Sequence, residues 1–173
     1  LSGDGTGKAQ SIIGNIGSSA SSDIKVLNIG ESGVSTNYST TTINGNVFAN
    51  STVLNNGATN SSELILASGK NITSTITTAD ANMGILTLAG GIQTVIGQVG
   101  TNGNKLAEVN AGNGTSTFVN DVYATNLDVE GTGTVNLDGK FTGTAVRYNA
   151  DGTVILADTK NIDSSVTTAT NNT

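Results

Sequence analysis

The chain has 173 residues, a formal net charge of −6, and a composition in which Gly, Thr, Asn and Ser fill just over half of the positions. Its seven basic residues stand singly, which excludes the concentrated basic face that nucleic-acid binding requires. It has no cysteine for a disulfide framework, and no apolar run approaches the roughly 20 residues of a membrane-spanning helix.

Short runs rich in Ile, Val and Leu predict strands along the whole chain. They begin with "IKVLNI" (24–29), "ELILA" (63–67) and "ILTLAG" (85–90). From residue 117 onward such runs start about every 8 residues, which is the spacing of short strands in an all-β protein. No segment keeps a helical spacing of apolar residues for three turns, so we expect an all-β fold.

Several segments occur twice. "SGKNITSTITTA" (68–79) returns as "DTKNIDSSVTTA" (158–169), and "LILA" (64–67) returns as "VILA" (154–157), both 90 residues later. "IIGNIG" (12–17) resembles "VIGQVG" (95–100), and "GNVFA" (45–49) resembles "NDVYA" (120–124), at shorter offsets. This pattern predicts one β-solenoid fragment over 1–173, with imperfect repeats at about 8–89 and 90–173 and loops of variable length.

Two all-β folds fit these strands: a right-handed parallel β-helix and an antiparallel β-sandwich. Four Asn-Gly pairs favour hairpins and the sandwich: Asn44-Gly45, Asn56-Gly57, Asn102-Gly103 and Asn113-Gly114. The scarcity of aromatic residues favours the β-helix, because a sandwich packs bulky side chains between its sheets. We expect coils of roughly 20–24 residues, an aliphatic interior, outward Thr, Asn and Ser, and corners where Gly and Asn adopt positive φ.

Residues 90–143 carry a turn "GQVGTNGN", a strand "VYATNL" and a strand "GTVNLDG", and a "TTA" segment precedes "GILTL". In these features the chain resembles passenger repeats of rickettsial surface cell antigens, the outer membrane protein A and B type autotransporters. The resemblance implies a surface-displayed parallel β-helix taken from a longer chain that ends in a membrane barrel. It also implies roles in adhesion to host cells or in a surface coat.

Candidate catalytic residues are few. "GDGTGK" (3–8) has the wrong spacing for a phosphate-binding loop and is interpreted as a turn. Asp128 and Glu130 lie two apart on a predicted strand, with Asp121 expected one coil away and Arg147 as the sole arginine. Because histidine is absent and aromatic platforms are scarce, we interpret this pair as a solvated outer face.

The Asp-Gly segments "NLDGK" (136–140) and "NADGT" (149–153) are interpreted as type I′ or G1-bulge corners rather than calcium sites. We therefore predict no catalytic residue, no cofactor and no metal site, and no enzyme. The predicted function is an adhesin or display stalk on the bacterial cell surface. Its expected partner is a host-cell protein or glycan, contacted through loops such as 17–25 and 55–63. The alternatives are a coat or filament protein that binds copies of itself end to end and, more remotely, a polysaccharide-active enzyme.

Overall fold

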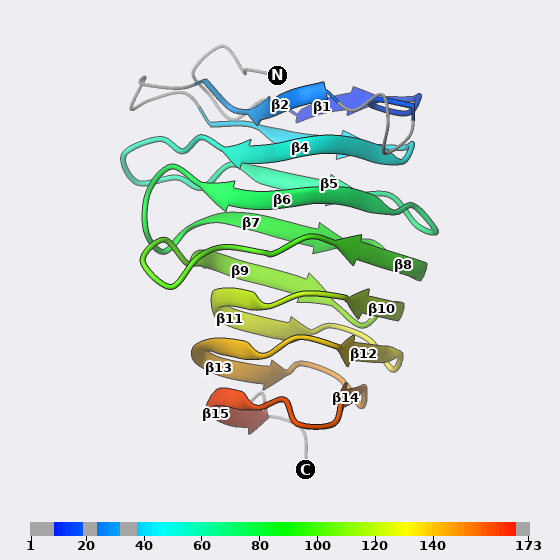
Figure 1. Ribbon diagram of the computed structural model, residues 1–173, viewed down its shortest axis with the longest axis vertical. Helices are drawn as coiled ribbons and strands as arrows, with labels where there is room; N and C mark the ends of the chain where they lie inside the picture. Colours follow the sequence, from blue (N-terminus) through cyan, green and yellow to red (C-terminus); the bar gives the residue numbers. More distant parts are fainter. Residues whose placement is uncertain (1–8, 19–23, 32–37, 169–173) are drawn as a thin grey trace.

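The computed structural model describes residues 9–18, 24–31 and 38–168, and in this part of the chain the regular structure consists of parallel strands. Successive strands alternate between two sheets that stack along one axis (Figure 1). The eight-stranded sheet contains, in spatial order, β1 (Ala9–Ile12), β3 (Thr40–Ile43), β5 (Glu63–Leu66), β7 (Met83–Leu88), β9 (Leu106–Ala111), β11 (Val122–Val129), β13 (Phe141–Tyr148) and β15 (Ile162–Thr168). The seven-stranded sheet contains β2 (Ile24–Ile29), β4 (Val47–Leu54), β6 (Ile72–Thr78), β8 (Gly91–Ile96), β10 (Gly114–Phe118), β12 (Thr134–Leu137) and β14 (Thr153–Leu156).

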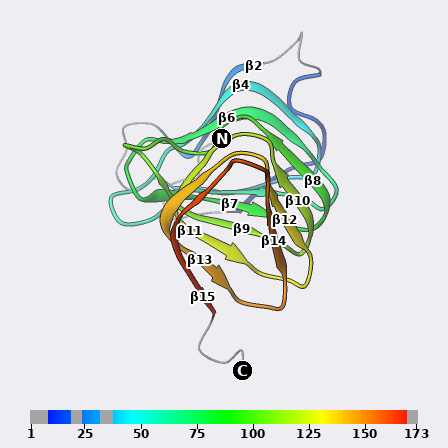
Figure 2. The same cartoon turned by 60° about the horizontal axis from the view of Figure 1, so that its bottom comes forward.

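This arrangement is a right-handed parallel β-helix, which confirms the favoured fold and rules out the antiparallel sandwich. Figure 2 shows the coils lying over one another along the axis. The coils differ in length along the chain. Partners in the eight-stranded sheet are 22 or 23 residues apart between β3 and β9, 18 or 19 apart between β9 and β13, and 20 or 21 apart between β13 and β15. The expected length of roughly 20–24 residues therefore fits these coils except the two between β9 and β13.

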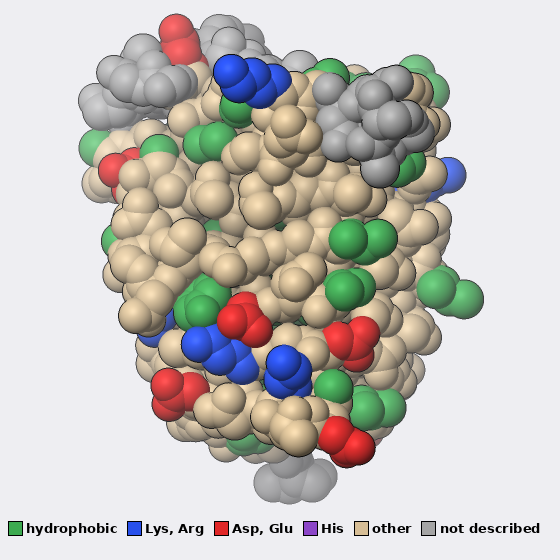
Figure 3. Space-filling view, viewed as in Figure 1, with side chains coloured by type: hydrophobic (Ala, Val, Ile, Leu, Met, Phe, Trp, Pro, Cys, Tyr) green, Lys and Arg blue, Asp and Glu red, His purple; other side chains and the backbone are tan. Residues whose placement is uncertain are grey.

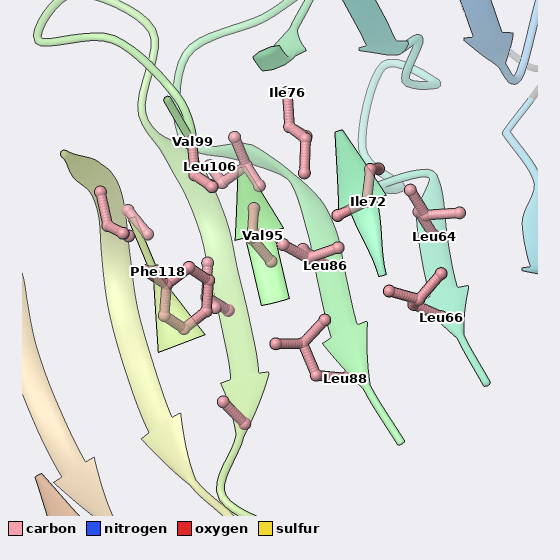
Figure 4. Close-up of a cluster of buried hydrophobic side chains, with 14 of the residues drawn as sticks. Leu64, Leu66, Ile72, Ile76, Leu86, Leu88, Val95, Val99, Leu106 and Phe118 are labelled. Carbon is pink, nitrogen blue, oxygen red and sulfur yellow. The ribbon is translucent and has the colours of Figure 1, made fainter. Parts of the chain in front are cut away.

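A continuous aliphatic core fills the interior. Leu64, Leu66, Leu86, Leu88 and their neighbours in Figure 4 point inward from both sheets. They alternate with residues that point outward and are only partly buried: Glu63 and Ile65 on β5, and Met83, Ile85 and Thr87 on β7. Because each coil buries its apolar residues against the coils beside it, the core has no separate centre and extends with every added coil.

The interior is less uniformly aliphatic than predicted, because several polar side chains are fully buried. Gln93 is the largest departure: its side chain is inaccessible although it lies on the interior face of β8. Its Oε1 accepts the Gly90 N–H at 2.7 Å, and its Nε2 donates to the carbonyls of Leu66, Ala67 and Lys70 at 3.0–3.2 Å. This buried amide thus joins the Gly90 corner to the corner of the preceding coil, where Leu66 O also accepts the Ala89 N–H and Ala67 O the Lys70 N–H.

The corners use asparagine differently from our expectation. Only one described asparagine, Asn82, has a positive φ. Three others form a ladder in which each Oδ1 accepts a backbone N–H of the next coil: Asn15 from Asn46, Asn46 from Asn71, and Asn71 from Thr94, at 2.8–2.9 Å. The side-chain carbonyl, rather than left-handed backbone, is thus what makes asparagine useful at this corner.

Glycine at another corner permits close stacking of coils. A Cβ on Gly114 would lie 2.3 Å from the carbonyl oxygen of Gly91, and a Cβ on Gly133 would lie 2.0 Å from that of Gly114. Gly45, Gly103 and Gly114, all second residues of Asn-Gly pairs, do not adopt left-handed φ. The hairpin interpretation of these pairs is wrong, because each pair lies between strands of different sheets that do not pair with each other.

The repeated segment lies in opposite sheets in its two copies. β5 and β6 correspond in sequence to β14 and β15, but β5 belongs to the eight-stranded sheet and β14 to the other. Their turns are nevertheless alike: Lys70 N–H bonds Ala67 O at 3.1 Å, and Lys160 N–H bonds Ala157 O at 3.2 Å. Gly69 and Thr159 both take left-handed φ, of 70° and 66°. The repeated segment therefore forms the same strand-turn-strand unit whether its first strand lies in the eight-stranded or the seven-stranded sheet.

Candidate functional site

The densest charged cluster in the described chain links three neighbouring coils of the eight-stranded sheet. Arg147 on β13 donates from Nε and Nη2 to the carboxylate of Asp128 on β11, its register partner. Its Nη2 also donates to Oε2 of Glu108 on β9 at 3.1 Å. The Asp128 side chain is 2% exposed, whereas those of Arg147 and Glu108 are 38% and 31% exposed.

This geometry makes the cluster a clamp between coils. The hydrogen bonds to Asp128 raise the pKa of Arg147 above its ordinary value, so the guanidinium stays charged at every physiological pH. Both Asp128 oxygens and the Glu108 oxygen accept hydrogen bonds from the same guanidinium. Arg147 is therefore paired within the chain rather than placed to bind an anionic ligand.

The carboxylates considered from the sequence do not converge. Asp128 is buried and paired, so the prediction of a solvated outer face is wrong for it. Glu130 is exposed beyond the end of β11 and accepts the Asn149 amide at 2.7 Å. Asp121 lies at the corner before β11, about 20 Å along the strand from Asp128. It accepts the Lys140 N–H at 3.1 Å and the Tyr123 hydroxyl at 3.3 Å.

The Asp121 corner carries a second contact. The Lys140 ammonium lies 5.1 Å from the centroid of the Tyr123 ring, within the range of a cation–π interaction. Its hydrogen bond with Tyr123 raises the pKa of Lys140. This corner and the Arg147 clamp involve separate partners and form no common site.

A polar row continues from the clamp toward the N-terminal coils. Thr87 Oγ1 donates to Glu63 Oε1 at 2.7 Å, and Asn110 Nδ2 donates to Thr87 at 3.2 Å. Asn110 is the register partner of Asp128, and its buried Oδ1 has no hydrogen-bond partner in the described part of the chain. The Asn110 Oδ1 and the Asp128 carboxylate are both acceptors, so they form no hydrogen bond with each other between β9 and β11. The polar row therefore consists of two separate hydrogen-bonded groups.

The Arg147–Asp128 pair was not predicted, although a short repeat in the sequence indicates it. "GTVNL" (133–137) and "GTVIL" (152–156) repeat at a spacing of 19 residues, which is the coil length in this half of the chain. The same spacing separates Asp128 from Arg147 and Glu130 from Asn149. The 90-residue repeat is longer and easier to see, but it spans several coils and so does not indicate which residues lie beside each other on adjacent strands.

A second candidate site is a ridge of exposed loops at one corner of the N-terminal coils. The loop ridge consists of the tips 57–60, 79–82 and 101–104, which follow β4, β6 and β8 and project on the left of Figure 1. Residues at the bases of the tips link neighbouring loops: Gly84 N–H bonds Ser61 Oγ at 3.0 Å, and Asn82 N–H bonds Lys105 O at 2.8 Å. The corresponding connections in the next two coils shorten to 119–121 and 138–140, and the last one spans 157–161.

The predicted contact loop 55–63 belongs partly to this ridge. Ala58, Thr59 and Asn60 are exposed, but Asn55, Asn56 and Ser62 are buried. Asn56 donates to Leu54 O and Thr78 Oγ1, and its Oδ1 accepts the Ser62 N–H at 2.9 Å. Only the tip is therefore open to a partner. Much of the other predicted loop, 17–25, and all of "GDGTGK" lie outside the described residues.

The described residues contain no group of three or more acidic side chains placed to hold a metal ion. The Asp-Gly segments at 138–139 and 151–152 are corners, but neither glycine has left-handed φ, so the turn types predicted for them are wrong. Within the same residues, no helix has the length and apolar character needed to cross a membrane.

Charge is distributed unevenly along the rod. Between residues 38 and 104 only Glu63, Lys70 and Asp80 are charged, and Figure 3 shows charged side chains gathered mainly over the C-terminal coils. The loop ridge thus lies on a polar but nearly uncharged part of the surface. No protein-family model matches the sequence, and neither a curated protein nor a solved structure shows significant similarity to it.

Proposed function

We propose that this chain is a segment of a surface-displayed bacterial passenger of the autotransporter type. In this proposal the β-helix is a stalk, and the loop ridge contacts a protein or glycan of a host cell. The observation that carries the proposal is the loop ridge itself: at one corner, three consecutive coils join their strands through 55–62, 79–82 and 97–105, whereas the next two coils close the same corner through 119–121 and 138–140. The resemblance of residues 90–143 to rickettsial passenger repeats supports the cell-surface location.

The ridge is built for binding with little loss of conformational entropy. Gly57 N–H bonds Asn60 O at 2.9 Å, and Thr101 N–H bonds Asn104 O at 3.0 Å, so that two of the three tips close on themselves. Preorganised loops lose less freedom on binding than open ones. Their polar, weakly charged surface favours recognition by hydrogen bonds over long-range electrostatic attraction.

The proposal predicts that three arginines on the ridge abolish cell binding. In a Thr59→Arg, Ala81→Arg, Asn102→Arg variant, bulky charged side chains cover every tip, and we expect saturable binding of the labelled protein to mammalian cell monolayers to fall about tenfold or more. The matched control places three arginines at exposed sites of the opposite corner, Ser68, Asn113 and Thr132. Equal losses in both variants, or no saturable binding by the natural sequence, would count against the ridge.

A further inference from the structure

The four Asn-Gly pairs of the chain share a reactive chemistry, because an asparagine side chain cyclises onto the main-chain nitrogen of the residue that follows it. A following glycine favours this reaction, since it has no Cβ to hinder its nitrogen and permits the backbone rotation that closes the ring. The structure separates the pairs by what holds the asparagine amide and the glycine N–H. The pairs are Asn44-Gly45, Asn56-Gly57, Asn102-Gly103 and Asn113-Gly114.

Asn56-Gly57 is held at both reacting groups. Asn56 is buried, and its Nδ2 donates to Leu54 O at 3.1 Å and to Thr78 Oγ1 at 2.8 Å. Its Oδ1 accepts a main-chain N–H at 2.9 Å. The Gly57 N–H donates to Asn60 O at 2.9 Å. Because cyclisation would break these hydrogen bonds, the fold protects this pair.

Neighbouring coils hold two further pairs. Asn44 Nδ2 donates to a hydroxyl and a carbonyl of β1 at 3.0 and 3.2 Å, and Gly45 is buried. In the Asn113-Gly114 pair the glycine is held instead: Gly114 is the first residue of β10 and the register partner of Gly91 on β8. Cyclisation at either position would move main-chain atoms that are stacked between coils.

Asn102-Gly103 lacks these restraints. Both residues are exposed at the tip 101–104 of the loop ridge. The tip is closed by Thr101 N–H to Asn104 O and by Asn104 N–H to Thr101 Oγ1, both at 3.0 Å. Within the described residues, no hydrogen bond engages the Asn102 side chain or the Gly103 N–H. A Cβ on Gly103 would meet nothing within 4 Å, so the surroundings leave space for the ring to form.

We propose that Asn102 is a site of spontaneous deamidation, which reacts faster than the other three Asn-Gly pairs. Hydroxide takes the proton of the Gly103 N–H, and the nitrogen attacks Cγ of Asn102. The bond between Cγ and Nδ2 then breaks, and the amino group takes a proton from water and leaves as ammonia, which regenerates hydroxide. Water opens the resulting succinimide at either carbonyl and gives aspartate or isoaspartate at position 102.

The reaction changes the charge of the loop ridge. It adds one negative charge to a chain whose net charge is −6. The new carboxylate stands on a nearly uncharged surface, since only Glu63, Lys70 and Asp80 are charged between residues 38 and 104. The isoaspartate product also lengthens the main chain by a methylene group, which an exposed loop tip tolerates. This chemistry follows from the tip itself and occurs whether or not the loop ridge binds a host cell.

The test is incubation of the folded protein at mildly alkaline pH, followed by digestion with trypsin and mass spectrometry. Cleavage after lysine places Asn102 in the peptide 71–105 and the other three pairs in 26–70 and 106–140. Fragmentation of each peptide locates the mass difference between an amide and a carboxylic acid. We expect the product to accumulate at Asn102 about tenfold or more faster than at Asn56, because each hydrogen bond that must break raises the barrier.

Two controls show whether the fold and the glycine set this rate. In protein unfolded by urea, all four pairs should react at similar rates, because the restraints on three of them are gone. Gly103→Ala should slow the reaction at Asn102 about tenfold, since the added methyl group hinders the attacking nitrogen. Circular dichroism checks that this variant folds.

Three results would overturn the proposal. The first is an equal rate at Asn102 and Asn56 in the folded protein, and the second is a faster reaction at Asn44 or Asn113. The third is an unchanged rate in the Gly103→Ala variant, which would mean that the amide is lost without attack by the main-chain nitrogen.

Discussion

Replacing Arg147 by methionine should destabilise the C-terminal coils by about 3 kcal/mol, because it leaves the buried carboxylate of Asp128 without a partner. The partial exposure of Arg147 allows some water to reach Asp128 in the variant, which places the estimate at the lower end for broken buried pairs. Urea unfolding followed by circular dichroism measures the loss.

A double replacement distinguishes the energy of the Arg147–Asp128 ion pair from the cost of leaving the Asp128 carboxylate unpaired. Replacing both residues together, as Asp128→Leu with Arg147→Met, should restore stability to within about 1 kcal/mol of the natural chain, since no unpaired charge remains. If Arg147→Met alone costs less than about 0.5 kcal/mol, the clamp contributes nothing beyond an exposed surface ion pair.

Gly133→Ala should cost about 3 kcal/mol or more, through packing alone. The added Cβ would lie 2.0 Å from Gly114 O and 2.7 Å from Gly112 O, both backbone atoms that cannot move without separating two coils. Gly133 has no left-handed φ, so strain of the backbone does not enter.

Gly103→Ala is the control for this substitution. Gly103 also lacks left-handed φ, and a Cβ there meets nothing within 4 Å. We expect this variant to unfold at the same urea concentration as the natural chain, or slightly higher because alanine restricts the unfolded chain. Similar losses at Gly133 and Gly103 would contradict the direct stacking of glycine corners.

Short runs of Ile, Val and Leu predicted the strands, and the repeated segments together with the scarcity of aromatic residues favoured the parallel β-helix over the sandwich. Contacts between coils were harder to foresee, because they depend on coil length, and loop insertions change that length along the chain. Asp128 therefore seemed solvated, although the 19-residue spacing of "GTVNL" and "GTVIL" places Arg147 beside it.

Polar residues misled for a related reason. Gln93 is polar, yet it is buried, because its amide can accept the Gly90 N–H and donate to carbonyls of the preceding coil at the same time. Asparagine at corners was assigned to left-handed backbone on its intrinsic preference, whereas in the ladder of Asn15, Asn46 and Asn71 each side-chain oxygen accepts a backbone N–H of the next coil. Neither contact is visible until the register is known.

The most direct test of this architecture is a pair of engineered cysteines, since the natural chain has none. Thr117 and Asn136 are register partners on parallel strands, and their side chains are hydrogen-bonded at 3.3 Å. Parallel neighbours about 4.8 Å apart lie within reach of a disulfide. We therefore predict that Thr117→Cys with Asn136→Cys forms an intramolecular disulfide under mild oxidation, detected by mass spectrometry. A hairpin through Asn113-Gly114 would instead place Thr117 opposite Asn110, so cross-linking of a Thr117→Cys, Asn110→Cys chain in place of the first would contradict the β-helix.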